Sequence, residues 1–137
     1  MRFGILLVLA LLVAGCTSDS PGGPTGPLDV QIVVGMAETA DVQGASIRIR
    51  FQGVMGDSRC PGDATCIQGG DALVRIDVLP TGSAGPSATY DLHTGNLQPV
   101  KHGDLTIALV QLSPYPFSSR GPISPGEYRA TLRITRS

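Results

Sequence analysis

The chain has 137 residues, with ten basic and eleven acidic side chains, a formal net charge of −1 and no tryptophan. This even balance provides no basic patch for a phosphate backbone, so we expect no nucleic-acid partner. Once the N-terminal segments described next are set aside, about 110 residues remain, which is enough for one domain with a buried core.

The first residues are typical of an exported protein. Met1-Arg2-Phe3 precedes an apolar run, Gly4 to Gly15, that ends at Cys16. A positive start, about a dozen apolar residues and a small-residue cut site form a secretory signal. The run is shorter than the roughly 20 apolar residues of a membrane-spanning helix. Its end, Leu12-Val13-Ala14-Gly15-Cys16, resembles the lipobox of bacterial lipoproteins, and an ordinary signal peptide is the alternative.

This resemblance implies that the chain is cut before Cys16 and that Cys16 carries a thioether-linked diacylglycerol. Residues 1–15 would then be a signal peptide, and the acyl chains would attach the protein to a membrane of the bacterial envelope. Each buried methylene contributes ~0.8 kcal/mol, so two or three chains form a nearly permanent anchor. Thr17 follows the cysteine in place of an aspartate, which implies the outer membrane where the host has two membranes.

Residues 16–27 are rich in Pro, Gly, Ser and Thr and contain no large apolar residue. Such a segment cannot bury enough surface to fold, so we expect a disordered tether. Residues 28–137 are expected to form the single folded domain.

Apolar and polar residues alternate along most of this domain, which predicts half-buried strands. Expected strands, in chain order, are Val30–Val34, Thr39–Val42, Ser46–Gln52, Ala72–Leu79, Thr89–His93, Leu105–Leu112 and Tyr128–Thr135. The run Leu105–Leu112 is apolar almost throughout, so we expect a central strand that is covered on both faces. Gly-containing turns separate the runs and no window has a helical period. The pattern predicts an all-β fold, either an antiparallel sandwich of the immunoglobulin type or a small barrel, of about seven strands.

Cys60 and Cys66 remain once Cys16 is assigned to lipid. In an oxidising compartment two cysteines pair by default, and Pro61-Gly62-Asp63 provides a turn between them. We predict a disulfide worth on the order of 2 kcal/mol. The spacing does not fit a Cys-x-x-Cys redox pair.

Metal sites are weaker alternatives at the same segment. A four-ligand zinc site would have to recruit His93 and His102 beside both thiolates, and copper(I) would accept the thiolates with at least one histidine. Asp57, Asp63 and Asp71 could surround calcium, but their spacing differs from an EF-hand loop, so we expect solvated turn aspartates and no cofactor.

The segment Ser113–Gly126 contains four prolines, which prevent regular strand pairing. Tyr115, Phe117 and Arg120 lie among them and form a candidate binding loop, since aromatic residues and arginine are common interface anchors. Alternatively, the two rings fold back to cap one end of the sandwich.

Only His93 and His102 could act as ordinary general bases, and we expect both to be solvated. The sequence has no nucleophile elbow, no paired-histidine zinc motif and no phosphate-binding loop. We therefore do not expect an enzyme.

Several motifs together resemble a group of small bacterial lipoproteins to which no activity is assigned. They are Phe51-Gln52-Gly53-Val54, the run Asp57-Ser58-Arg59-Cys60-Pro61, Cys66, the pattern Gly70-x-Ala72-x-Val74, Leu112–Pro116 and Tyr128–Leu132. The resemblance implies the fold and an envelope location, but no catalytic residue. Members often carry a tryptophan after the second cysteine, where this chain has Ile67-Gln68.

We therefore expect a non-catalytic lipoprotein that binds an envelope protein or a surface polymer. A metal-handling lipoprotein and a protease inhibitor that uses residues 113–126 are the alternatives.

Overall fold

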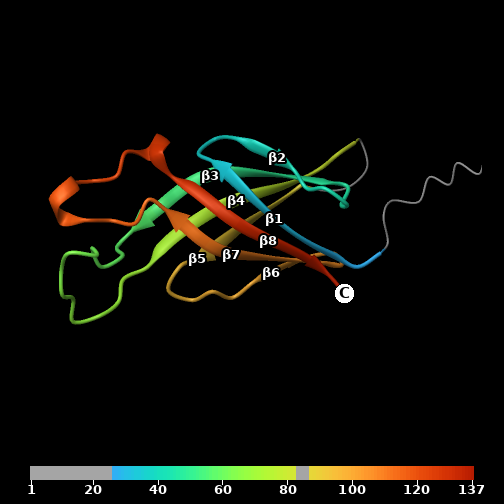
Figure 1. The fold of residues 1–137 in the computed structure, drawn as a ribbon. Coiled ribbons are helices and arrows are strands. Elements are labelled where there is room, and N and C mark those ends of the chain that lie inside the picture. The colour runs from blue at the N-terminus through green and yellow to red at the C-terminus, as the bar shows by residue number, and fades with distance from the viewer. Residues whose placement is uncertain (1–25, 83–86) are drawn as a thin grey trace, which may run out of the picture.

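A computed structural model describes residues 26–82 and 87–137 of the chain (Figure 1). The expected signal peptide 1–15, the lipidation site Cys16 and the tether as far as Thr25 lie outside the described residues.

The described residues form two four-stranded antiparallel sheets, which confirms the predicted all-β sandwich. The first sheet has the order β1 (Leu28–Gly35), β8 (Arg129–Arg136), β7 (Leu105–Ser113), β6 (Val100–His102). The second has the order β2 (Thr39–Asp41), β3 (Ile47–Asp57), β4 (Ala72–Pro80), β5 (Ala88–His93). Two short 3₁₀ helices, η1 (Ser118–Arg120) and η2 (Pro125–Glu127), lie between β7 and β8.

The strand order follows from the short connections. Strands β2 to β5 are consecutive in sequence, and each pairs with the next in one sheet. An immunoglobulin constant domain instead divides its strands as A-B-E-D and C-F-G, which requires connections that cross between sheets. Here the chain changes sheets after β1, between β5 and β6, and at no other point among the described strands.

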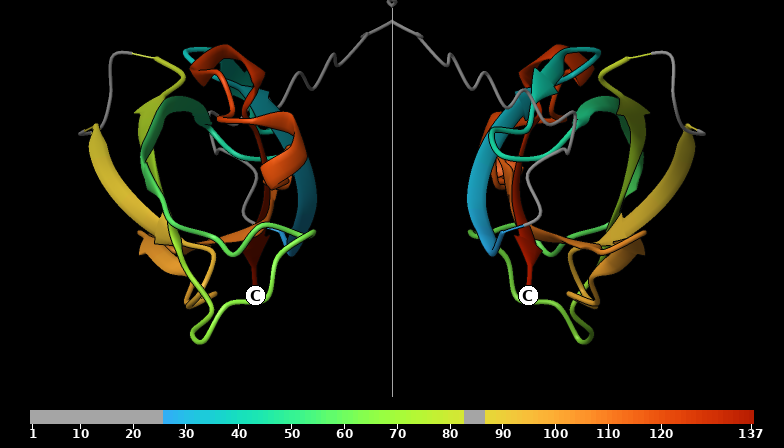
Figure 2. Two further views of the ribbon diagram at one scale, coloured as in Figure 1. Left: turned by 90° about the vertical axis from the view of Figure 1, so that its left-hand side faces the viewer. Right: turned by 90° about the vertical axis from the view of Figure 1, so that its right-hand side faces the viewer.

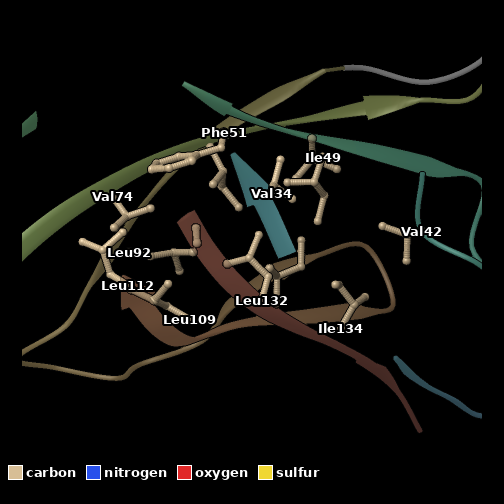
Figure 3. Close-up of a cluster of buried hydrophobic side chains, with 14 of the residues drawn as sticks. Val34, Val42, Ile49, Phe51, Val74, Leu92, Leu109, Leu112, Leu132 and Ile134 are labelled. Carbon is tan, nitrogen blue, oxygen red and sulfur yellow. The ribbon is translucent and has the colours of Figure 1, made fainter. Parts of the chain in front are cut away.

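Alternating side chains of both sheets meet in one core (Figure 3). Fully buried members include Ile49, Phe51 and Ile76 from the second sheet, and Ile107, Leu132 and Ile134 from the first. Seen end-on in Figure 2, the two sheets curve around this shared interior. Burial of each such side chain contributes ~2 kcal/mol, so the core is the main source of stability.

The structure corrects the sequence-based expectations in the β6–β7 hairpin. Residues 100–102 form the short strand β6, which is not among the seven strands expected from the sequence, so the described residues contain eight strands. Strand β7 is interior to its sheet, but the prediction that both of its faces are covered is wrong. Val110 and Gln111 are exposed, because no further layer packs on the outer face of this sheet among the described residues.

Candidate functional site

Two long loops meet at one end of the sandwich. The disulfide loop (residues 58–71) connects β3 to β4, and the proline loop (residues 114–128) connects β7 to β8. In Figure 1 both loops extend from the same end of the sheets, the first in green and the second in orange to red. The candidate binding residues of the sequence analysis lie on the proline loop.

Cys60 and Cys66 form the predicted disulfide, with their Cα atoms 6.0 Å apart. Cys66 is exposed and Cys60 is half-buried, so the bond closes a surface loop and lies outside the core. Both sulfurs are used in this bond, so neither is present as the thiolate that a zinc or copper site would need. Over residues 26–82 and 87–137, no three side chains of His, Cys, Asp or Glu gather as a group that could hold a metal ion.

The disulfide loop holds the proline loop through backbone contacts. The Asp63 carboxylate accepts hydrogen bonds from the N–H groups of Ser118, at 2.6 Å, and Ser119, at 2.9 Å. The Gly62 N–H donates to the Pro116 carbonyl at 2.9 Å. These N–H donors lower the pKa of Asp63 to about 2, so the carboxylate is ionised at neutral pH.

Gly62 is required for this close approach. A Cβ atom at this position would lie 2.8 Å from the ring of Phe117, which is closer than carbon atoms pack. The absence of a side chain therefore lets the Phe117 ring lie against the backbone of the disulfide loop.

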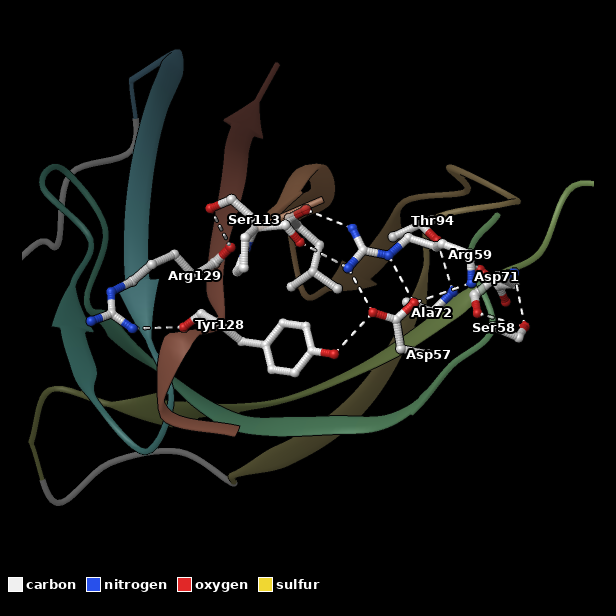
Figure 4. Close-up of polar contacts among 11 residues, drawn as sticks. Asp57, Ser58, Arg59, Asp71, Ala72, Thr94, Ser113, Tyr128 and Arg129 are labelled. Carbon is white, nitrogen blue, oxygen red and sulfur yellow. Dashed lines mark hydrogen bonds and ion pairs between the residues drawn. The ribbon is translucent and has the colours of Figure 1, made fainter. Parts of the chain in front are cut away.

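A buried ion pair fixes the base of both loops (Figure 4). The Arg59 guanidinium binds both carboxylate oxygens of Asp57, with Nε–Oδ1 at 2.9 Å and Nη2–Oδ2 at 2.6 Å. It also donates to the carbonyls of Leu112, at 2.8 Å, and Pro114, at 3.0 Å. The Tyr128 hydroxyl donates to Asp57 Oδ2 at 2.9 Å. One arginine thus connects the end of β3, the end of β7 and the proline loop.

The charges of this network are maintained at neutral pH. Burial acts to raise the pKa of Asp57, but the hydrogen bonds from Arg59 and Tyr128 outweigh it and the pKa is lowered. Burial, together with the bond to Asp57, raises the pKa of Tyr128 to about 12. At neutral pH, Asp57 and Arg59 are therefore both charged and form a structural ion pair, and the Tyr128 phenol is neutral.

The rings of the proline loop lie at the surface. Tyr115 is 51% exposed and Phe117 is 37% exposed, so neither ring folds back into the core. The two rings contact edge to face, with centroids 6.3 Å apart. The guanidinium of Arg59 lies over the Tyr115 ring at 5.4 Å, and that of Arg120 over Phe117 at 5.6 Å. The sequence-predicted trio is thus brought together on one exposed surface.

Two hollows flank Tyr115. The larger, of about 210 Å³, we call the β7 groove; its lining includes exposed Leu97 and Val110 and, at its base, buried Leu109 and Leu112. The smaller, of about 100 Å³, is lined by Tyr115, Phe117, Arg120, Pro122, Ile123 and neighbouring residues of the proline loop. Leu97 is 60% exposed and Val110 is 47% exposed, and the sequence analysis did not single out either residue. The sequence feature that could have pointed to Leu97 is its position as a large apolar residue directly after the turn Thr94-Gly95-Asn96.

The two histidines have separate partners. His93 is exposed to solvent, as predicted, and its Nδ1 lies 2.5 Å from Asp71 Oδ2. His102 Nδ1 lies 3.1 Å from the Tyr90 hydroxyl, so His102 is likewise bonded to a side chain of the protein. Neither histidine approaches the disulfide sulfurs as a ligand would, since no cluster of that kind is present in the described part of the chain.

Asp57, Asp63 and Asp71 do not gather into a group that could hold a metal ion among the described residues, and each carboxylate accepts hydrogen bonds from protein donors. Asp71 accepts from the Gly95 N–H, at 2.7 Å, and the Thr94 hydroxyl, at 3.1 Å, as well as contacting His93. Burial acts to raise the pKa of Asp71, but these contacts outweigh it and lower the pKa to about 2.

Ser58 lies beside this cluster, but its hydroxyl donates to the backbone carbonyl of Asp71, at 2.9 Å, and accepts from the Asp71 N–H, at 3.1 Å. Its hydrogen bonds are therefore with backbone and not with His93, so the three side chains do not form a serine–histidine–aspartate relay.

No helix in residues 26–82 and 87–137 has the length and apolarity needed to cross a membrane. The sequence matches no protein-family model, and neither a curated protein nor a solved structure is significantly similar to it.

Proposed function

We propose that the protein is a membrane-anchored lipoprotein of the bacterial envelope whose β-sandwich domain binds another protein or a surface polymer without catalysis. The lipobox-like end at Cys16 supports the anchor. A tether of residues 16–27 would let the domain reach at most ~40 Å from the membrane surface. A domain on such a tether can meet partners in the same membrane or in the adjacent cell wall.

The observation that carries the binding role is the exposed pair Tyr115 and Phe117 on a loop that is held in place by other contacts. Large exposed apolar groups rimmed by polar residues mark interaction sites on soluble domains. Tyrosine and arginine are also among the residues that contribute most to binding energy. Because Asp63 and Arg59 already fix the proline loop, binding would lose little conformational entropy there.

A catalytic role has less support in the geometry. The ring-nitrogen contacts of the two described histidines are His93 with Asp71 and His102 with Tyr90, so neither imidazole is bonded to a serine or cysteine nucleophile, and the Asp57 carboxylate is paired with Arg59. The proposal is therefore a binding module.

Photocross-linking in the native cells tests the binding role. A photoreactive phenylalanine analogue replaces Tyr115 in the full-length protein, and the matched control places it at Val33, which is 62% exposed on β1. We expect a discrete adduct with one envelope protein or polymer from position 115 and none from position 33. Identical adducts from both positions, or no adduct at position 115, would contradict the proposal. An adduct with an extracellular protease would favour the inhibitor alternative.

The anchor is tested separately. Replacement of Cys16 with alanine should abolish labelling by radioactive palmitate and move the protein from the membrane fraction to the soluble fraction. Unchanged membrane association of the Cys16→Ala variant would show that the anchor assignment is wrong.

A further inference from the structure

Strand β7 has an open backbone edge next to the β7 groove. On one side it pairs with β8 from Thr106 to Ser113, but on the other side β6 pairs only with Leu105–Ile107. Pro99 precedes the first residue of β6, and a proline has no N–H group with which to continue the ladder. Beyond Ile107, no described strand is therefore hydrogen-bonded to this side of β7.

Arg59 marks the far end of the open edge. Its Nη1 donates to the Leu112 carbonyl at 2.8 Å, so that carbonyl already has a partner. The open section is thus Ala108–Gln111, and no turn or loop in the described part of the chain bonds to its backbone. A section of this length can take one short extended segment as an added strand.

The side chains beside this edge are mainly apolar, unlike those on the outward face of the edge strand β5. Val110, Leu97 and Tyr115 are exposed around the β7 groove of about 210 Å³, which has room for a large apolar side chain. The outward residues of β5 include Asp91 and His93, charged or polar groups of the kind that discourage strand addition.

Arg120 is a cationic group beside the groove that can pair with a carboxylate of a partner. Arg120 stacks on Phe117 and has no carboxylate partner in residues 26–82 and 87–137. Two carboxylates of these loops have backbone partners: Asp63 accepts from the Ser118 and Ser119 N–H groups, and Glu127, which lines the same small hollow as Arg120, accepts from the Ser124 N–H. The small hollow lined by Arg120 shares Tyr115 with the β7 groove, so one ligand can contact both.

We propose that an extended segment of a partner protein adds to β7 along Ala108–Gln111, places an apolar side chain in the β7 groove and sets a carboxylate against Arg120. This inference rests on the proposed binding function and names its ligand as a peptide instead of a polymer. Main-chain hydrogen bonds to an open sheet edge supply affinity in this mode, and alternate side chains supply specificity. A sugar polymer has no regular row of N–H and C=O groups to match that edge.

The test uses the full-length, lipid-modified protein in lipid nanodiscs and a phage-displayed library of random dodecapeptides. We expect selected peptides to combine a large apolar residue with a nearby aspartate or glutamate. The strongest is then synthesised and its affinity measured by calorimetry. V110K and R120E should each weaken it about tenfold, while V33K, at an exposed site on β1, should leave it unchanged.

Backbone methylation tests the strand addition itself. N-methylation at alternate peptide residues should abolish binding, and methylation at the intervening residues should be tolerated, because only every second N–H faces the neighbouring strand. Equal tolerance at all positions, or selected peptides that bind V110K as well as the native protein, would overturn the inference.

Purified cell-wall polymer separates this inference from the proposed function. If polymer binds in a Val110- and Arg120-dependent way and no peptide is selected, the peptide assignment is wrong while the binding function stands. If the native protein self-associates through this edge and V110K makes it monomeric, the occupant is a second copy and the inference is likewise wrong. If the cross-linking at Tyr115 also fails, the proposed function falls as well.

Discussion

Replacement of Arg59 with methionine should cause a large loss of stability, because it removes one half of a buried ion pair. The Arg59 side chain is 5% exposed and that of Asp57 is 12% exposed. Methionine keeps much of the apolar stem but leaves the Asp57 carboxylate with only the Tyr128 hydroxyl and its own loop as donors. It also removes the partner of the Leu112 and Pro114 carbonyls.

The expected change in unfolding free energy follows from these lost partners. Breaking a buried pair by removing one member costs about 3–5 kcal/mol, and each orphaned carbonyl belongs to the same network. Total stability of such a domain is about 5–15 kcal/mol, so R59M should lower the melting temperature by roughly 10–20 °C. The exposed pair Arg75–Asp91 provides the matched control, and R75M should change stability by less than about 1 kcal/mol.

Urea unfolding followed by far-ultraviolet circular dichroism measures both variants, since the chain has no tryptophan to report by fluorescence. The double variant D57N/R59M should recover part of the loss, because the uncompensated charge is removed with its partner. If R59M costs no more than R75M, or the double variant shows no coupling, the buried pair does not hold the loops as described.

Three further predictions concern the same end of the molecule. The double variant C60S/C66S should lose about 2 kcal/mol of stability. Hydrogen exchange should then accelerate at the Ser118 and Ser119 amides while the β3 and β8 amides stay protected; faster exchange throughout the sheets would show that the disulfide supports the core instead. G70A should destabilise by about 1–3 kcal/mol, because its Cβ would overlap the Ser58 carbonyl, whereas G69A, with nothing near its Cβ, should be neutral in the same urea assay. Equal midpoints for the two variants would refute this close contact. Stability should be nearly constant from about pH 5 to neutral pH and fall as the pH approaches 2, because Asp63 and Asp71 have a folded pKa of about 2 against an unfolded value of 3.8, so the unfolded state binds more protons in that window. The D71N variant should show a shallower acid dependence of the urea midpoint, and an unchanged slope would contradict the role of this carboxylate.

Most of the fold could be predicted because each strand carries its own signal. Alternation over Ala72–Leu79 and Tyr128–Thr135 placed the core face of β4 and β8, and a glycine-containing turn preceded the run that forms β7. Strand β6 was missed because three residues are too few for a period to be read. The exposed face of β7 was misread because a largely apolar run does not show whether a second layer covers it.

The candidate site was predictable only in part. The disulfide followed from two cysteines and a turn between them, and the aromatic pair Tyr115 and Phe117 stood out by composition. Arg59 was not singled out, because a buried arginine has the same local pattern as a solvated one. The β7 groove was missed for a related reason, since Leu97 and Val110 come from separate segments that only the packing of the loops brings together.

The sequence by itself determined seven of the eight described strands, the core-facing residues of the alternating strands and which two thiols are close enough along the chain to pair. Those features depend on side-chain period and on short chain separation, and both are local. Only the tertiary structure decided that the proline loop lies on the disulfide loop, that Arg59 joins both to the end of β7, and that one edge of β7 stays open. These contacts join residues more than fifty positions apart, and their geometry depends on how the two sheets pack and not on any one segment.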